Sequence, residues 1–200
     1  MASTPKVNLL AFATLMLFLA GCATQTSTVV PDSAWEQRRA TLTELDEFKA
    51  DGKIALRTSE RSDSASMIWV QSGGSSYVNL SGPLGTGATN LRSDGKTVTI
   101  TRNGEVQTYS AEDYESLDDF GIPVGTIGYW ARGIPDPALP IDDIAVTDNL
   151  LQSLVQSGWT ITYTGYDHFG SYTLPTRLQL SKGSSVVTIF LYDWSLPVVQ

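Results

Sequence analysis

The sequence TVTITRNGEVQTYS, residues 97–110, contains the pattern that predicts the fold of this chain. Apolar and polar side chains alternate over residues 97–101, which predicts a strand with one buried face and one wet face. Asn103-Gly104 follows, and Asn and Gly tolerate the positive φ angles that a two-residue hairpin turn requires. The stretch is therefore predicted to form an antiparallel hairpin of strands 97–102 and 105–110.

The same pattern of short strand-like runs and turn residues continues in both directions from this hairpin. Short runs rich in Val, Ile, Thr, Tyr and Trp are separated by Gly, Asn, Asp and Ser, with tight turns at Gly73-Gly74 and Asp94-Gly95. Residues 149–156 fit a helix or a strand, and a strand is favoured because Ser157-Gly158 then turns the chain into the next strand. Residues 137–147 are predicted to be loop or edge material. The further strands are predicted at 49–58, 64–71, 76–81, 88–93, 149–156, 159–166, 177–182 and 185–194.

One predicted strand lacks the alternation. Ser66-Met67-Ile68-Trp69-Val70 carries large apolar side chains at successive positions. Successive side chains of a strand point to opposite faces of the sheet. Both faces of this strand are therefore expected to be covered.

Three segments have helical patterns, at residues 32–48, 111–120 and 126–132. In the first, Trp35, Leu42, Leu45 and Phe48 fall near one face at helical spacing. That stripe predicts a helix packed on the sheet, and a helix that binds a partner is the alternative. The fold class that follows is mainly β (α+β). It is an incomplete, half-open antiparallel β-barrel of about ten to eleven strands, with a few helices as a lid over an apolar cavity.

The N-terminal segment has the features of an export signal. Lys6 precedes a short apolar run, residues 7–20, and small residues follow it. The sequence Leu19-Ala20-Gly21-Cys22 resembles the lipobox of bacterial lipoproteins, which implies lipidation of Cys22. An ordinary cleaved signal or an uncleaved anchor is the alternative. The expected organisation is a removed signal peptide at 1–21, a lipidated N-terminus and tether at 22–31, and one domain at 32–200.

Composition excludes several classes of function. The chain has 13 Lys and Arg against 21 Asp and Glu, and nucleic-acid binding needs clustered basic residues. Cys22 is the only cysteine and His168 the only histidine, so neither a disulfide within the chain nor a zinc site is expected. No metal and no cofactor is predicted.

Several stretches, in this order behind a lipobox, resemble the LolB family of outer-membrane lipoprotein receptors. The resemblance covers nearly the whole chain after the signal. The stretches that carry it are Trp35-Glu-Gln-Arg38, Gly52-Lys-Ile-Ala-Leu56, Trp69 with Gln71, Gly82-Pro-Leu-Gly85, Trp130 with Gly133-Ile-Pro135, Gly158-Trp159, Gly165-Tyr166, Leu174-Pro-Thr-Arg-Leu178 and Trp194.

The resemblance implies a function and a location. Members of this family take lipoproteins from the periplasmic carrier LolA and insert them into the inner leaflet of the outer membrane. The expected partners are a LolA-type carrier, the acyl chains of cargo lipoproteins and outer-membrane lipid, with no nucleic acid. The chain is expected to be a monomer, anchored by its lipid to the periplasmic face of the outer membrane.

The resemblance also implies two sets of site residues. The loop Gly82, Pro83, Leu84 and Gly85 matches the family loop whose apolar residue helps to push lipid into the bilayer. A hairpin loop whose leucine folds back on the core is the alternative for Leu84. The second set would line the acyl cavity, although each member could equally be ordinary core: Ile54, Leu56, Met67, Trp69, Val98, Ile100, Ile161, Tyr163, Leu178, Leu180, Ile189 and Leu191.

Two other classes of function are compatible with parts of the sequence. An envelope lipoprotein that binds a protein partner and no lipid would keep the anchor and the sheet but fill the concavity with side chains. An enzyme would have to use Asp167, His168 and Ser171, which lie close together in the sequence. Members of a catalytic triad usually come from separated segments, so a turn between strands is predicted for 166–171 and no enzymatic activity is expected.

Overall fold

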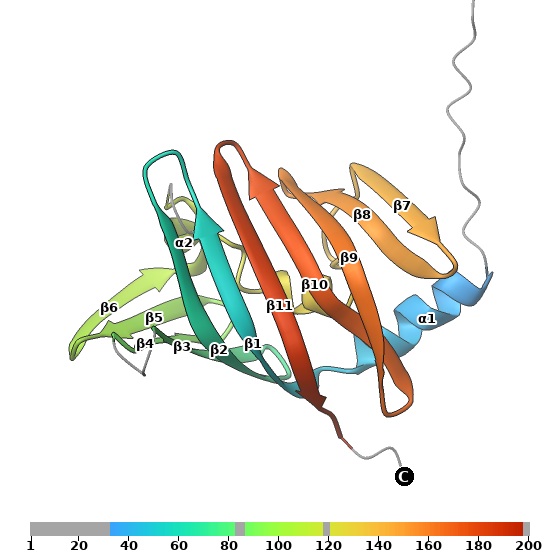
Figure 1. The fold of residues 1–200 in the computed structure, drawn as a ribbon, viewed down its shortest axis with the longest axis horizontal. Helices are drawn as coiled ribbons and strands as arrows, with labels where there is room; N and C mark the ends of the chain where they lie inside the picture. Colours follow the sequence, from blue (N-terminus) through green and yellow to red (C-terminus); the bar gives the residue numbers. More distant parts are fainter. Residues whose placement is uncertain (1–32, 83–86, 118–120, 198–200) are drawn as a thin grey trace, which may run out of the picture. The chain divides into compact units, whose positions relative to one another are not determined.

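The fold was determined as a computed structural model that describes residues 33–82, 87–117 and 121–197. These residues form an 11-stranded antiparallel sheet (Figure 1). All of its elements lie within residues 32–200, which make up a compact unit of their own. In chain order the elements are α1 (Ser33–Glu44), β1 (Glu47–Arg57), β2 (Ser62–Ser72), β3 (Ser75–Ser81), β4 (Thr89–Ser93), β5 (Thr97–Arg102), β6 (Glu105–Ser110), α2 (Ala111–Glu115), α3 (Ile127–Ala131), β7 (Asp143–Thr147), β8 (Leu150–Gln156), β9 (Trp159–Phe169), β10 (Tyr172–Lys182) and β11 (Ser185–Ser195).

The sheet consists of two meanders. Strands β1 to β6 pair in sequence order, and so do strands β7 to β11. The two meanders join where β1 pairs with β11, so β6 and β7 are the edges of the sheet. In Figure 1 the strands β3 to β6 run across the direction of β9 to β11, so the sheet curls without closing.

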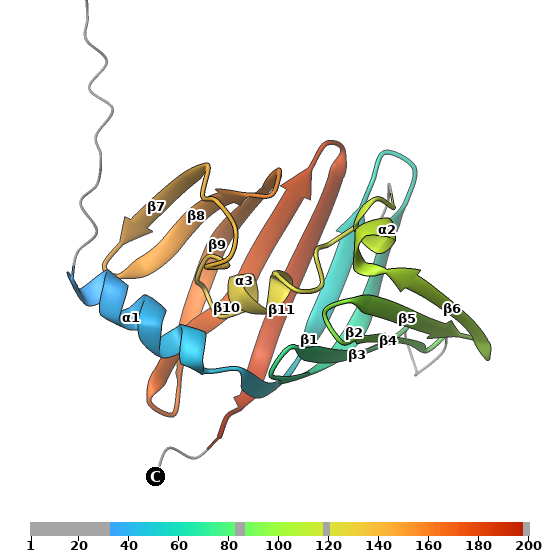
Figure 2. The same cartoon turned by 180° about the vertical axis from the view of Figure 1, so that it is seen from behind.

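The helices cover one face of this sheet, called here the inner face. Figure 2 shows α1 and α3 over the β8–β11 part and α2 at the other end, near β5 and β6. The predicted arrangement, helices over the concave side of an unclosed antiparallel sheet, is therefore confirmed. Among the described residues, no helix is both long enough and apolar enough to cross a membrane.

The hairpin that led the prediction has the predicted bounds, and several other elements differ. The first helix ends at Glu44, because the chain is already extended at Glu47 and Phe48, which pair with Ser72 and Gln71. The prediction of a helix to residue 48 was therefore wrong. The second helix ends at Glu115, not at 120, and residues 118–120 lie outside the described part.

Two further predictions were wrong. Strand β2 is covered on one face only: Met67 and Trp69 are buried, whereas Ile68 and Val70 are 39% and 38% exposed. Residues 166–168 belong to strand β9, and the turn is shorter than expected because β10 already begins at Tyr172. Residues 143–147 form the edge strand β7, which agrees with the prediction of edge material.

The buried side chains form two clusters. The large one contains residues of α1, α3 and the strands β1, β2 and β8 to β11. The small one consists of Val98, Tyr114 and Val124, with half-buried side chains of β4 to β6 packed against it. The segment between α2 and α3 contributes to both, because Ile122 belongs to the large cluster and Val124 to the small one.

Candidate functional site

The inner face of β8 to β11 is filled by side chains from the helices. Trp130 of α3 has no exposed surface, and Trp35 and Leu42 of α1 belong to the same cluster. Opposite them lie sheet residues such as Ile161 and Leu178, which are also fully buried. We call this region the closed half of the inner face.

A buried glutamine fastens α3 and the loop after it to this half. Gln156 ends strand β8 and has no exposed surface. Its Oε1 accepts hydrogen bonds from the indole Nε1 of Trp130 at 2.9 Å and from the backbone N of Asp136 at 3.0 Å. Its Nε2 donates to the carbonyl oxygens of Asp136 and Leu139 at 3.0 and 3.2 Å. The Tyr163 hydroxyl donates to the Trp130 carbonyl at 2.9 Å, and complete burial raises the pKa of this phenol well above its usual range.

Two arginines hold α1 in place. Arg132 is buried, stacks over the Tyr129 ring, and donates through Nη1 to the carbonyl oxygens of Leu42 and Leu45. It thereby supplies a positive charge to the C-terminal end of α1, which carries unpaired carbonyl groups. Desolvation lowers the pKa of Arg132 from its usual value. Arg38 donates from α1 to the carbonyl of Thr173 in β10.

The inner face of β3 to β5 is covered much less. Val78 pairs with Trp69 and Leu91, and Leu91 pairs with Ile100, so these side chains share the face of the buried Trp69. Leu80 lies two residues after Val78 and faces the same way. The four aliphatic side chains are nevertheless only partly buried. This row, Val78, Leu80, Leu91 and Ile100, is called here the open half of the inner face.

The short helix α2 and the segment after it pack over one end of the open half. Tyr114 of α2 and Val124 pack over Val98 of β5. Burial raises the pKa of Tyr114 to about 12, as expected for a phenol in an apolar environment. The inner face therefore combines a filled region with an adjoining apolar strip that is only partly buried.

The predicted cavity residues all lie on or beside this inner face, in two groups. Val98 belongs to the small cluster, and Ile100 is partly buried against it. Ile54 is partly buried against the large cluster, and the other nine are buried within it: Leu56, Met67, Trp69, Ile161, Tyr163, Leu178, Leu180, Ile189 and Leu191. Of the twelve, Ile54 and Ile100 alone are partly exposed, so these two border the accessible part of the face.

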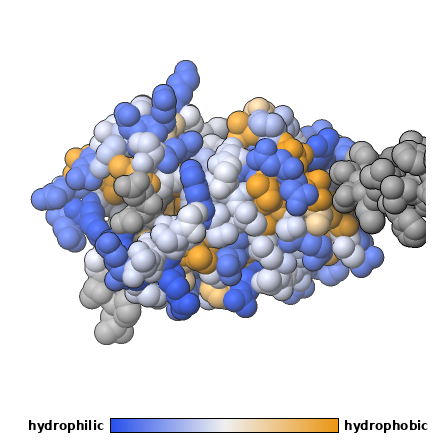
Figure 3. Space-filling view, turned by 90° about the horizontal axis from the view of Figure 1, so that it is seen from above, coloured by the Kyte–Doolittle hydropathy of each residue, from blue (hydrophilic) through white to orange (hydrophobic). Residues whose placement is uncertain are grey.

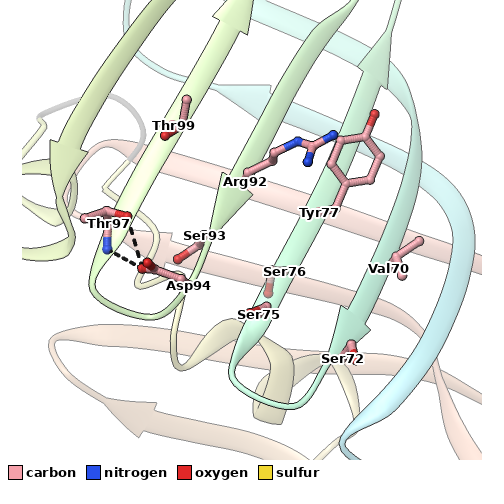
Figure 4. Close-up of a pocket in the computed structure, with 10 residues that line it drawn as sticks. All are labelled: Val70, Ser72, Ser75, Ser76, Tyr77, Arg92, Ser93, Asp94, Thr97 and Thr99. Atoms are coloured by element: carbon pink, nitrogen blue, oxygen red, sulfur yellow. Dashed lines mark hydrogen bonds between the residues drawn. The ribbon is translucent and has the colours of Figure 1, made fainter.

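A separate groove of about 370 Å³ lies elsewhere on β2 to β5 (Figure 4). Apart from Val70 and Tyr77, its lining residues are Ser, Thr, Asp and Arg, and the Arg92 guanidinium lies over the Tyr77 ring, 4.9 Å from the ring centroid. Asp94 accepts hydrogen bonds from the backbone N–H groups of Lys96 and Thr97, which lower the pKa of its carboxyl. The predicted cavity residues do not line this groove. Figure 3 shows that apolar residues reach the surface in separate patches among hydrophilic ones.

The histidine is placed among exposed side chains. His168 pairs with Thr173 of β10, and its Nδ1 lies 3.1 Å from the Thr173 hydroxyl. The Asp167 carboxylate accepts a hydrogen bond from the His168 backbone N–H. Within residues 33–82, 87–117 and 121–197, His, Asp and Glu form no group of three that could hold a metal ion.

Two predicted sites lie wholly or mostly outside the described residues. These are the lipidation site, Cys22, and the loop, of which Gly82 is described and Pro83, Leu84 and Gly85 are not. Sequence reasoning also missed the roles of Gln156, on the inner face, and of Arg132, at the end of α3. The sequence of β8, LLQSLVQ, has no distinct signal for Gln156, because Gln152 and Ser153 in the same strand are also polar and are not fully buried.

Comparison with known proteins identifies the relatives of the chain. Residues 46–194 match the family model described as "Outer membrane lipoprotein LolB". A protein named Outer-membrane lipoprotein LolB from Pseudomonas aeruginosa (strain PAO1 among its designations) is 33% identical over 198 residues, which cover 94% of this chain and 96% of the relative. The protein of that name from Chromohalobacter salexigens is 34% identical, covering 91% of this chain and 87% of the relative.

Solved structures show the same fold at low sequence identity. A LolA superfamily protein from Nitrosomonas europaea superimposes with a TM-score of 0.54 at 12% identity, covering 84% of this chain and 94% of that one. A putative outer membrane lipoprotein-sorting protein domain from Vibrio parahaemolyticus gives 0.54 at 9% identity, covering 81% and 90%.

Proposed function

The chain belongs to the LolB family of outer-membrane lipoproteins, and from this premise we propose that it receives lipoproteins from a LolA-type periplasmic carrier and inserts them into the outer membrane. The acyl chains of the cargo would lie on the apolar inner face of the sheet. The protein itself would be held at the periplasmic face of the outer membrane by lipid on Cys22. It would act as a binding and transfer protein and not as an enzyme.

The observation that supports this proposal is the open half of the inner face. Val78, Leu91 and Ile100 form a continuous apolar row in which each side chain is only partly buried. A row of apolar side chains that folding leaves only partly buried is a candidate binding surface. Strands supply a flat row of aliphatic side chains, which suits a long, flexible acyl chain better than a compact polar ligand.

The energy of acyl transfer requires such a surface at each step. Burying an acyl chain of about fourteen methylenes away from water is favourable by about 11 kcal/mol, at about 0.8 kcal/mol for each methylene. Release into water would forfeit that energy, so the chain must pass directly from one apolar site to the next. The sequence has no phosphate-binding Gly-rich loop before Lys-Ser or Lys-Thr. Transfer would therefore be driven by increasing affinity, from carrier to this protein to the bilayer.

The direct test is a transfer assay with the polypeptide from Ala23, which contains the complete compact unit of residues 32–200. It is incubated with a LolA-type carrier that holds a labelled lipoprotein, and liposomes are added afterwards. We expect the label to move to this protein and then to the liposomes. If the label stays on the carrier while circular dichroism shows a folded protein, the proposal fails, and a lipoprotein that binds only a protein partner becomes the better account.

The insertion step can be tested separately at Leu84. In the proposed function this leucine enters the lipid surface, so Leu84→Glu would place a charge there at a high energetic cost. We expect the variant to accept labelled cargo normally but to deliver it to liposomes at least about tenfold more slowly, an effect of about 1.4 kcal/mol. Normal delivery by Leu84→Glu would show that the loop has no part in insertion. Leu84→Ile is the matched control, because it keeps an apolar side chain.

A further inference from the structure

Gln156 uses its whole hydrogen-bonding capacity on one segment. A side-chain amide has two N–H donors and an oxygen that can accept two hydrogen bonds. In Gln156 the four bonds go to the side chain of Trp130 and to backbone groups of Asp136 and Leu139. Each partner lies in α3 or in the loop that follows it. A single buried side chain therefore ties this segment to the end of β8.

The indole that Gln156 holds occupies apolar space on the inner face. Trp130 has no exposed surface and packs in the large cluster with sheet residues of the closed half. A hydrogen-bond partner is not a general feature of buried indoles in this protein, since in the described part the Nε1 atoms of Trp69 and Trp194 have none. The hydrogen bond to Gln156 thus distinguishes the Trp130 indole from those two.

We propose that Trp130 is an internal occupant of the acyl-binding site and that Gln156 is the positioning residue that keeps it there. This inference rests on the proposed function. An acyl chain that enters along the open half and continues into the closed half must displace the indole. Gln156 therefore sets how tightly the site holds an acyl chain, and keeps that affinity low enough for the cargo to leave for the bilayer.

The physical reason is that displacing the Trp130 indole costs free energy, and this cost is subtracted from the free energy of binding an acyl chain. When only a fraction of molecules has the binding-competent form, the apparent affinity is reduced by that fraction. Removing Gln156 leaves the Trp130 indole N–H and the Asp136 N–H without partners while the segment stays in place. An unpaired buried donor is unfavourable, and displacement lets both groups reach water. Loss of Gln156 therefore raises the competent fraction.

The main experiment measures acyl affinity and stability together in Gln156→Leu. The probe is a fluorescent sixteen-carbon fatty acid, titrated into the polypeptide from Ala23, and stability is measured by urea unfolding. We expect the variant to bind the probe about tenfold more tightly, as for a tenfold larger competent fraction, while its unfolding midpoint falls. A merely structural role would lower stability without tightening binding. Gln152→Leu is the control in the same strand, since the Gln152 amide donates to the nearby Leu150 carbonyl and has no other hydrogen bond within the described residues, and the affinity of this variant should not change.

A second variant keeps the inference testable if Gln156→Leu does not fold. Trp130→Phe removes the indole N–H and much of the ring but leaves Gln156 bonded to the backbone of Asp136 and Leu139. We expect it to bind the probe about threefold more tightly, because less apolar volume must be displaced. It also identifies the Trp130 indole N–H signal by its absence from the NMR spectrum. In the wild-type protein that N–H should exchange slowly with solvent when free and rapidly when the probe is bound.

The outcomes separate this inference from the proposed function. If the wild-type protein accepts labelled lipoprotein but Gln156→Leu and Trp130→Phe bind the probe no more tightly than it does, the inference is overturned and the transfer function stands. Continued slow exchange of the Trp130 indole N–H with probe bound would overturn it as well. If neither the wild-type protein nor the variants bind probe or lipoprotein, both the inference and the proposed function fail.

Discussion

The closed and open halves of the inner face are built from strands with the same alternation but have different cover. Ile161, Leu178 and Ile189 are at most 1% exposed in the closed half, whereas Leu91 and Ile100 in the open half are only partly buried. Among the described residues the difference comes from the helices, because α1 and α3 lie over one region and the short α2 lies near the other (Figure 2). An apolar strand face therefore does not reveal whether it is core or binding surface until its cover is known.

The largest expected loss of stability follows from a substitution at the junction of the two meanders, next to the closed half. Gly52 lies at a bulge between β1 and β11, and a Cβ added there would lie 2.0 Å from the Phe190 carbonyl oxygen. Backbone cannot move aside as a flexible side chain can, so Gly52→Ala should lower the free energy of unfolding by about 4 kcal/mol. Urea denaturation measures it.

The control for this substitution is Gly74→Ala. A Cβ added at Gly74 would meet no atom within 4 Å, and its φ is not in the left-handed region. We expect a change of less than about 0.5 kcal/mol. Equal stability of the two variants would show that the β1–β11 junction is not as tight as described.

A pair of leucines tests the comparison itself. Leu178 faces the closed half and is fully buried, whereas Leu91 faces the open half. Leu178→Ala should cost about 3 kcal/mol of stability, because it removes buried methylenes and leaves a cavity. Leu91→Ala should cost about 1 kcal/mol, because the side chain is already partly in water. Equal losses in thermal or urea unfolding would contradict the division into two halves.

Ile100→Thr in the open half is expected to change stability least but to weaken the binding of an acyl chain. Ile100→Thr keeps the β-branched shape that suits a strand but adds a hydroxyl to the open half. We expect a loss of stability below about 1 kcal/mol and about fivefold weaker binding of a fluorescent fatty acid, since less apolar area is buried. Val106→Thr is the control, because Val106 pairs with Thr101 on the opposite face of the sheet and is 63% exposed. Unchanged binding by Ile100→Thr would place the acyl site elsewhere.

The strands and turns were predictable because their signals are local. Asn103-Gly104 and Asp94-Gly95 mark turns by their backbone preferences, and the glycines do adopt positive φ angles. The bounds of β5 and β6 follow directly from these turns. The residues of the predicted cavity lie on or beside the inner face because period-two alternation fixes which side chains share a face.

The remaining features depend on contacts between distant segments. Leu45 and Phe48 continue the helical spacing of α1, yet Phe48 lies in a strand because β1 pairs with β2 there and the ring packs on Trp69 and Trp194. The partners of Gln156 and Arg132 lie 17 to 26 and 87 to 90 residues away in the chain, except for the local bond from Arg132 to Gly128. The exposure of Ile68 and Val70 likewise reflects the absence of cover, which strand composition does not encode.

The order of the strands also has a kinetic consequence. Within each meander a strand pairs with one that was synthesised immediately before or after it, and such local contacts form quickly. The pairing of β1 with β11 instead joins residues near the two ends of the compact unit, and closing so long a loop carries a larger entropic cost. The first meander must therefore wait with β1 unpaired on one side until β11 joins the sheet. During that interval its exposed edge is the part of the folding chain most in need of protection from aggregation.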